Sequence, residues 1–443
     1  MALKRSISHH RMENWNSRVI TFWTIAILAF LSACTLGDPE PTDQSPALSL
    51  HFEQNLSLTK LSWEHVKVTG FKEYILLQSA LDIPDSPTPV VNQNVTVVTR
   101  IKDVDVTSFL ASPVLFTPTV YYKLYCAVDD RFLYSPTIPV LQNIDAVNGF
   151  YDSGCHMPGN DEMVMFDRTT DHLSTVNYKT VAITSTAIDL NFSFPSLEMS
   201  QWNDVTNVLG FDQSPATLRK FNYPSLLNTG NVIFNQVLWA ARSYHQFVFV
   251  ATEEFGKGFQ VLNKNNFSVI ASAVGLSNNQ NIAVFPGDTI TVITFGVNGS
   301  KKYGIDAMGK IVSQQDLSVS LLQANLQSTC AQGSELFIAD ATGSIFNHAG
   351  ERMGSLSFSV NSFIQIIRLS PDEKKAIFIV NENGIQRLQI ADLSNLPAVT
   401  LLKSYDLPAL NYADIIPEED IIYVAGALFN SNQNQTFILK FPM

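Results

Sequence analysis

The sequence is poor in cysteine and in charged residues. Only four cysteines occur in 443 residues, which excludes a small fold framed by disulfides. Charged residues make up 15% of the chain and apolar residues 46%, a balance that excludes a disordered, solvating polypeptide. The net charge of −12 at pH 7 disfavours nucleic acid as a partner, because that affinity comes largely from neutralised phosphates. The apolar content is sufficient for two or three packed domains.

Long apolar runs are also scarce, and the run near the N-terminus is short. Four basic residues precede the thirteen-residue apolar run Val19–Leu31. Thirteen residues are too few for a membrane-spanning helix, which needs about 20. They are typical of the core of a secretory signal peptide. The stretch before the run is long, so either Met1 or Met12 is the start of translation.

The apolar run ends in Leu31-Ser32-Ala33-Cys34. This tetrapeptide resembles the lipobox of bacterial lipoproteins, which implies cleavage before Cys34 and lipidation of its thiol, with a stable acyl anchor in the membrane. In the Gram-negative lipoprotein family, a residue other than Asp after the cysteine, here Thr35, implies the outer membrane. Residues 1–33 are then the signal peptide and residues 34–46 a lipidated tether. The alternative is an ordinary signal peptide that happens to contain a cysteine.

Residues 47–142 contain short, strand-like apolar runs separated by Pro, Gly, Asn and Asp. In the run 120–126, alternate residues share one face, as in a half-buried strand. About seven such strands in this length predict an immunoglobulin-like sandwich. The phrases LSWEHVKVTGFKEYILLQS and VYYKLYCAVDDRFLYSP resemble the fibronectin type III family. That resemblance implies core positions for Trp63 and Tyr122, and a spacer or binding role without catalytic residues.

Residues 143–443 repeat with a period of about 43 residues. Strongly apolar strand centres recur at this spacing, the next strand ends in Asn or Asp, and a turn precedes the apolar strand. The strand centres are Met165, Leu209, Phe249, Val292, Phe337, Phe378 and Tyr423, and the Asn or Asp positions are Asn177, Asn222, Asn263, Asp306, Asn347 and Asp392. Three features in phase predict a seven-bladed β-propeller with four strands per blade, because only a ring of blades buries both faces of each sheet.

The segments LSPDEKKAIFIVNENGIQRLQIADLS and FILKF resemble the broad WD40-like/YVTN propeller superfamily. The Trp-Asp and Gly-His pairs of true WD40 repeats are missing, as are the double glycines of kelch repeats, so the subfamily stays open. The predicted fold class is therefore all-β, a fibronectin type III-like sandwich at 47–142 followed by the propeller at 143–443. The chain has no room for a fourth strand after Thr436–Phe441, so we predict that Asn143–Val147 pairs with this strand and closes the ring.

Motifs for catalysis or metal binding are scarce. No histidine has a His, Cys or carboxylate partner at metal-ligand spacing, so neither a metal nor a cofactor is predicted. The adjacent Cys155 and His156 could form a nucleophile and its base. Neighbouring residues on a strand point to opposite faces, however, which favours a structural role for Cys155. Cys155 and Cys330 are predicted on first strands of well-separated blades, so no disulfide is expected.

Acidic and amide side chains are predicted on opposite rims of the propeller. The turns between first and second strands carry the acids, and we call their rim the acidic rim. Its residues are Asp161, Glu162, Asp204, Asp288, Glu335, Asp372, Glu373, Glu418, Glu419 and Asp420. The opposite, amide-rich rim is predicted at residues 191–194, 228–235, 277–281 and 430–435. The acids favour a solvated face, with attraction of a basic partner as the alternative; amides with interspersed aromatic rings suit a glycan or a protein loop.

These observations predict a non-enzymatic envelope lipoprotein. The membrane is one partner, through lipidated Cys34, and an envelope protein or glycan is the other, bound by the propeller. Catalytic, cofactor-binding and metal-binding residues are all predicted to be absent. The alternative is a propeller-type hydrolase or lyase with carboxylates from several blades at the central channel, since a fold alone does not decide function.

Overall fold

All regular elements in the part of the chain that the structure describes are β-strands. In this range, no helix is long and apolar enough to cross a membrane. The computed structural model describes residues 48–187, 198–200, 205–213, 216–253, 258–274, 279–296, 299–319, 330–339, 343–357, 362–428 and 434–443. Cys34 and the predicted signal peptide and tether lie outside these residues.

The first eight strands form two antiparallel sheets. One sheet has the order β1-β2-β5, and the other β4-β3-β6-β7, with β8 also paired to β6. The first sheet consists of β1 (Leu50–Asn55), β2 (Leu58–Trp63) and β5 (Ser108–Ala111). The second consists of β3 (Phe71–Ser79), β4 (Val95–Ile101), β6 (Thr119–Val128), β7 (Arg131–Tyr134) and β8 (Ile138–Leu141).

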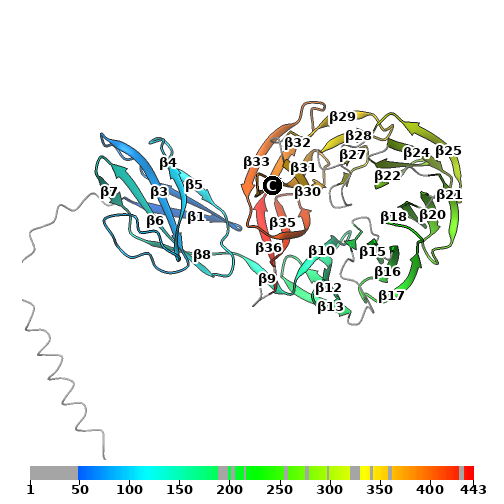
Figure 1. Cartoon of the computed structure of the whole chain (residues 1–443), viewed down its shortest axis with the longest axis horizontal. Coiled ribbons are helices and arrows are strands. Elements are labelled where there is room, and N and C mark those ends of the chain that lie inside the picture. Colours follow the sequence, from blue (N-terminus) through cyan, green and yellow to red (C-terminus); the bar gives the residue numbers. More distant parts are fainter. Residues whose placement is uncertain are drawn as a thin grey trace, which may run out of the picture. The chain divides into compact units, whose positions relative to one another are not determined.

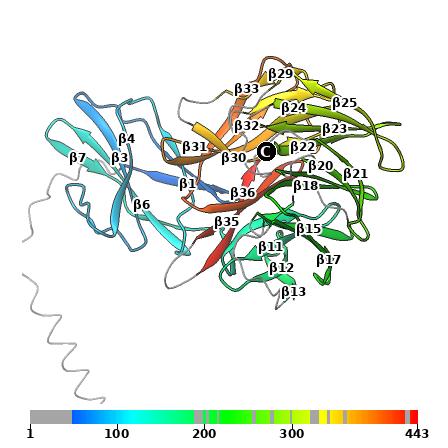
Figure 2. The same cartoon turned by 45° about the vertical axis from the view of Figure 1, so that its right-hand side comes forward.

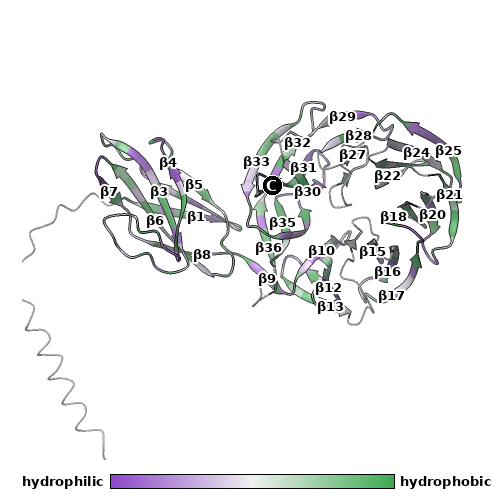
Figure 3. Cartoon of the chain, viewed as in Figure 1, coloured by the Kyte–Doolittle hydropathy of each residue, from purple (hydrophilic) through white to green (hydrophobic). Residues whose placement is uncertain are grey.

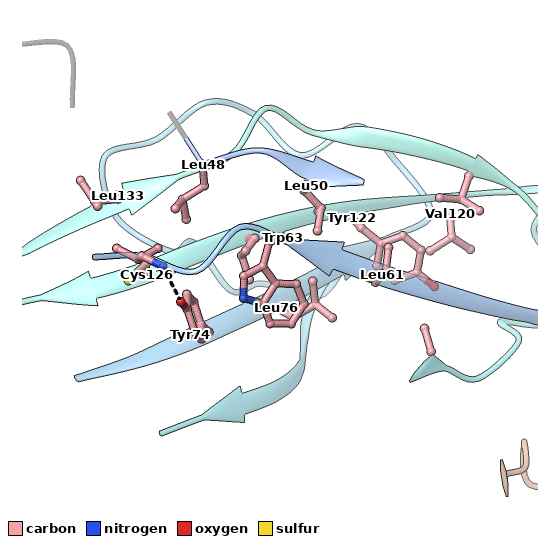
Figure 4. Close-up of a cluster of buried hydrophobic side chains, with 14 of the residues drawn as sticks. Leu48, Leu50, Leu61, Trp63, Tyr74, Leu76, Val120, Tyr122, Cys126 and Leu133 are labelled. Carbon is pink, nitrogen blue, oxygen red and sulfur yellow. Dashed lines mark hydrogen bonds between the residues drawn. The ribbon is translucent and has the colours of Figure 1, made fainter. Parts of the chain in front are cut away.

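A single hydrophobic cluster joins these two sheets (Figure 4). Trp63 and Tyr122 are 4% and 1% exposed, so the prediction that both belong to the core is confirmed. The Trp63 ring packs against Tyr74 with centroids 5.4 Å apart. The Tyr74 hydroxyl accepts a hydrogen bond from the backbone N–H of Val66 and donates to the carbonyl of Val104, so this polar atom has partners at the edge of the core.

Seven four-stranded sheets follow and surround a common centre (Figure 1). We number them as blades in chain order. Blade one contains β10 (Tyr151–His156), β11 (Glu162–Asp167), β12 (His172–Asn177) and β13 (Ala182–Ala187). Blade two contains β14 (Glu198–Met199), β15 (Asn207–Gln213), β16 (Ala216–Asn222) and β17 (Asn228–Ile233). Blade three contains β18 (Leu238–Tyr244), β19 (Phe247–Thr252), β20 (Phe259–Asn263) and β21 (Val269–Ala273).

The remaining blades follow the same order of strands. Blade four contains β22 (Asn279–Phe285), β23 (Ile290–Gly296), β24 (Gly299–Ile305) and β25 (Ile311–Leu317). Blade five contains β26 (Ala331–Gln332), β27 (Leu336–Ala339), β28 (Ser344–Asn347) and β29 (Arg352–Ser355). Blade six contains β30 (Ser362–Leu369), β31 (Lys375–Glu382), β32 (Ile385–Asp392) and β33 (Thr400–Asp406). Blade seven contains β34 (Asn411–Pro417), β35 (Ile421–Leu428), β36 (Gln435–Pro442) and, from the start of the ring, β9 (Asp145–Asn148).

Burial changes from the second strand of a blade to its fourth. The second strands are almost wholly buried, as in β19, because their two faces pack against the neighbouring blades. The fourth strands face solvent, as in β25. Figure 3 shows this contrast, with purple hydrophilic residues along β25. The seven apolar strand centres predicted from the sequence all lie on second strands, from Met165 on β11 to Tyr423 on β35, so the predicted propeller repeat is confirmed.

In blades one to six, the Asn or Asp at the end of the third strand shapes the turn that follows. Asn177 Oδ1 accepts hydrogen bonds from the backbone N–H groups of Lys179 and Thr180. Asp306 Oδ1 does the same for Met308 and Lys310. A short acceptor side chain that bonds to the backbone two residues on stabilises a turn, which explains why this position recurs in the sequence.

The ring closes as the sequence predicts. β9 pairs antiparallel with β36, placing Val147 opposite Thr436 and Asp145 opposite Ile438. β36 also pairs with β35 along its full length (Figure 2). The strand that completes blade seven therefore precedes blade one in the sequence.

Candidate functional site

Charged side chains lie on the first strands of the blades, close to the centre of the ring. Arg368 on β30 forms an ion pair with Asp414 on β34, with Nη2 2.5 Å from Oδ1. Asp414 is fully buried, and its Oδ2 accepts a hydrogen bond from the backbone N–H of His156 on β10 at 3.0 Å. One carboxylate therefore joins the first strands of blades six, seven and one.

A second polar group joins blades three, four and five. Arg242 on β18 is buried, and its Nη1 donates to the carbonyl of Ile282 at 3.1 Å and to Oε1 of Gln332 on β26. The Gln332 amide accepts from the N–H of Val284 at 2.9 Å and donates to the carbonyl of the same residue. It thus pairs with β22 as a neighbouring strand would. Burial lowers the pKa of Arg242 to about 9, because removal from water disfavours the charged guanidinium.

The adjacent Cys155 and His156 do not form a pair. Cys155 is fully buried in an apolar cluster with Val164 and Phe166. The His156 ring lies edge-on to Tyr178, with centroids 5.7 Å apart, and its Nε2 is 3.0 Å from the carbonyl oxygen of Asn160. These surroundings agree with the prediction that alternation along the strand separates the two side chains.

The other two described cysteines are also buried thiols. Burial raises the pKa of Cys126 in the sandwich and of Cys330 in blade five, in each case to about 11. For Cys330, the guanidinium groups of Arg242 and Arg368 act in the opposite direction, but burial dominates. A thiol needs its thiolate form to act as a nucleophile, so at neutral pH these positions are suited to packing.

Asp152 on β10 is the acidic residue whose environment best matches the alternative of an enzyme. Burial raises the pKa of its carboxyl group, while the positive charge of Arg168 lowers it and the nearby Asp167 raises it further. Arg168 Nε is 3.1 Å from Asp152 Oδ2. No group of three or more His, Cys, Asp or Glu side chains that could hold a metal ion occurs among the described residues.

Residues of the acidic rim connect neighbouring blades. The hydroxyl of Tyr178 in blade one donates to Oε1 of Glu418 in blade seven at 2.9 Å. The hydroxyl of Tyr223 in blade two donates in the same way to Oε2 of Glu162 in blade one. In both contacts the donor is the tyrosine that directly follows the third strand of its blade, β12 or β16. Part of the acidity of this rim therefore serves the contacts between blades.

Two further contacts extend this pattern. Lys179 Nζ lies 3.0 Å from Asp161 and 2.8 Å from Glu418, so it also bridges blades one and seven. The carboxylate of Glu373 in blade six accepts hydrogen bonds from the backbone N–H and the hydroxyl of Ser334 in blade five. A pocket of about 380 Å³ opens between the turns of blades six and seven, and acidic side chains contribute to its lining. Asp204 lies outside the described residues.

The amide-rich rim is described only in part. Of the loop predicted at 228–235, residues 228–233 instead form the strand β17, so the prediction was wrong there, because the connection from β16 already ends at Leu227. Phe234 and Asn235 follow the strand. Asn279–Asn281 belong to β22 and Gln435 to β36. Residues 191–194, 277–278 and 430–433 lie outside the described residues.

The charged groups on the first strands were not predicted from the sequence. Arg242, Arg368 and Asp414 each stand as a single charge within a short apolar strand, in AARSY, FIQIIRL and NYADII. A lone charge in such a segment is a usable signal, because a buried charge needs a partner. The partner itself is not visible, since Arg368 and Asp414 come together only through the packing of two blades.

Comparisons with known proteins find solved structures of low similarity. No protein-family model and no curated protein matches the chain. Each of three similar solved structures covers 67% of this chain. The Cps50 (Swd1) β-propeller domain of Myceliophteria thermophila is 11% identical over 98% of that chain (TM-score 0.45). BamB from Moraxella catarrhalis is 10% identical over 96% (TM-score 0.45), and Kuenenia stuttgartiensis hydrazine synthase is 12% identical over 96% (TM-score 0.46). At these values the likeness carries no argument about this chain.

Proposed function

We propose that this chain is a non-enzymatic lipoprotein of the cell envelope, held at the outer membrane through lipidated Cys34. Its propeller is a rigid scaffold that binds a protein or glycan partner of the envelope. The lipobox-like Leu31-Ser32-Ala33-Cys34 supports the anchor. The propeller supports the scaffold role, because a closed ring holds its rim loops on a fixed frame.

The use of the polar side chains near the centre of the ring carries this proposal. The side chains of Asp414 and Gln332 form their hydrogen bonds and ion pair with residues of neighbouring blades. Glu418 and Glu162 do the same on the acidic rim. Side chains that hold a frame together in this way favour a binding scaffold over a reaction centre, which needs groups directed at a substrate.

The N-terminal sheets support a resemblance to fibronectin type III. The strand orders β1-β2-β5 and β4-β3-β6-β7, with β8 also paired to β6, divide eight strands between two sheets that share one core, as immunoglobulin-like sandwiches do. In the proposed function this domain stands between the membrane anchor and the propeller, and contributes no catalytic group.

A hydrolase or lyase is the second candidate, and Asp152 is the observation that favours it. A carboxyl group with a raised pKa on a first strand is a candidate general acid. The two functions differ in what they do to a glycan. A scaffold retains the glycan unchanged, whereas an enzyme releases it shortened.

The anchor is tested by replacing Cys34 with Ala. We expect the variant to leave the membrane fraction and to lack acyl chains, because both the lipid and the lipoprotein-type processing depend on this thiol. Fractionation of cell envelopes and mass spectrometry of the N-terminal peptide measure the two effects. A variant that remains with the membranes as the parent does would contradict the lipobox interpretation.

The scaffold role is tested on the parent protein in its native envelope. Chemical cross-linking followed by mass spectrometry should recover one protein or one intact polysaccharide on propeller peptides, and not on peptides of the Cys34→Ala variant. Recovery of a shortened polysaccharide would support the enzyme instead. Cross-links spread over many unrelated molecules would contradict both.

A further inference from the structure

The edge of β36 is covered in two parts by segments from different regions of the chain. β9 pairs with residues Gln435–Ile438 only, although β36 continues to Pro442. Near the end of the strand, Lys440 bonds to the turn between β1 and β2. The N–H of Ser57 donates to the carbonyl of Lys440 at 3.0 Å, and the N–H of Lys440 donates to Ser57 Oγ at 2.8 Å.

Ser57 contacts a third segment as well. Its hydroxyl donates to the carbonyl of Asn143 at 3.1 Å, just before β9 begins. Lys440 Nζ in turn lies 2.6 Å from Asp145 Oδ2 on β9. The turn, the closing strand and the last strand of the ring therefore meet around one buried serine.

Apolar side chains of the sandwich also pack against β36. Leu58 is 3% exposed, and it belongs to the cluster that contains Phe437, Leu439 and Phe441 of β36. The loop before β6 adds a second contact, because the Phe116 ring packs edge-on against Phe437 with centroids 5.2 Å apart. The sandwich thus buries apolar surface of blade seven that would otherwise face water.

The backbone of the turn is adapted to this contact. Asn55 and Leu58 pair across a two-residue turn, and Leu56, its first residue, has φ of 58°. Glycine is the usual residue at such a position, because a side chain strains the left-handed backbone. Strain of this kind persists where the surroundings hold it, and here they hold Ser57 and Leu58 against β36.

We propose that the sandwich is a clasp of the propeller ring, in which the Leu56–Leu58 turn completes the part of the blade-seven edge that β9 leaves open. The sandwich is then an integral part of ring closure rather than an independent spacer. This inference concerns the ring itself and holds whichever partner the propeller binds.

Hydrogen exchange of the full chain, read by mass spectrometry, tests the clasp. Ser57→Ala removes the hydroxyl contacts and Leu58→Ala the apolar one, and either should speed exchange of residues 435–442 and 143–148 by about tenfold. Leu50→Ala is the matched control, because Leu50 is buried on the same hairpin but belongs to the cluster between the two sandwich sheets. It should speed exchange in the sandwich only, and residues 259–263 of blade three should stay unchanged in all variants.

Two outcomes would overturn the clasp. Unchanged exchange of β36 and β9 in Ser57→Ala would show that the turn does not support the ring. Equal acceleration of β36 by Leu50→Ala and Ser57→Ala would show that the sandwich acts only through its overall stability. If Leu58→Ala does not fold, Ser57→Ala alone decides between these results.

Discussion

Blade seven and the six blades before it are built on the same plan but from different kinds of chain segment. Each of blades one to six is a continuous stretch, in which every strand pairs with the next along the sequence. Blade seven takes three strands from the end of the ring and one, β9, from its beginning. The Thr436 hydroxyl donates to the carbonyl of Gly149, 287 residues away. The difference shows that ring closure depends on contacts distant in sequence, which lose chain entropy before they contribute stability.

The largest expected effect comes from removing the closing strand. A chain that begins at Gly149 lacks β9, whereas one that begins at Leu141 retains it, and both lack the sandwich. We expect the shorter chain to melt roughly 5–10 °C lower, because it exposes the edge of β36 and the cluster around Val147. Thermal unfolding followed by circular dichroism measures the difference. Equal melting temperatures would mean that blade seven is stable without its fourth strand.

The next effect concerns the central contact of blade seven. Asp414→Ala leaves the half-buried guanidinium of Arg368 without this carboxylate, and we expect a loss of about 3–5 kcal/mol in the free energy of unfolding. Gln332→Ala is the matched change among continuous blades. It removes an uncharged amide that joins blades four and five and accepts a bond from Arg242 of blade three. Arg242 keeps its bond to the carbonyl of Ile282, so the change should cost only about 1–3 kcal/mol. Urea unfolding of both variants gives the comparison, and a greater loss for Gln332→Ala would contradict it.

The propeller could be predicted from the sequence because each of its signals recurs from blade to blade. One blade has weak signals, but the apolar second strands and the turn-forming Asn or Asp recur seven and six times in phase, and each has a local physical cause. The closing strand was predictable for a related reason. Counting strands along the repeat left blade seven one strand short, and the segment before blade one had no blade of its own. The contacts of Arg242, Arg368 and Ser57 were not predictable, because each joins residues that only the packing of separate sheets brings together.

We expect the smallest loss of stability from removing a tyrosine hydroxyl at the interface between two blades. Tyr178 joins blade one to blade seven, and Tyr223 joins blade two to blade one, each through its hydroxyl and a glutamate. Because the two contacts have the same chemistry, Tyr178→Phe and Tyr223→Phe should each cost about 0.5–1.5 kcal/mol. A much larger loss for Tyr178→Phe would show that the contact between blades one and seven depends more strongly on this single hydrogen bond than the contact between blades one and two does.

The same two tyrosines also make the stability of the protein depend on pH in the alkaline range. Burial raises the pKa of both tyrosines, and the hydrogen bond to the glutamate raises it further. Above pH 10 the unfolded chain loses these phenolic protons while the folded chain keeps them, so the folded state binds more protons and stability falls as pH rises. Each Phe variant should therefore lose stability less steeply above pH 10 than the parent, and by a similar amount. Urea unfolding at pH 8 and at pH 10.5 measures the slopes, and a parent-like slope in Tyr178→Phe would mean that this hydroxyl ionises as readily in the ring as in the unfolded chain.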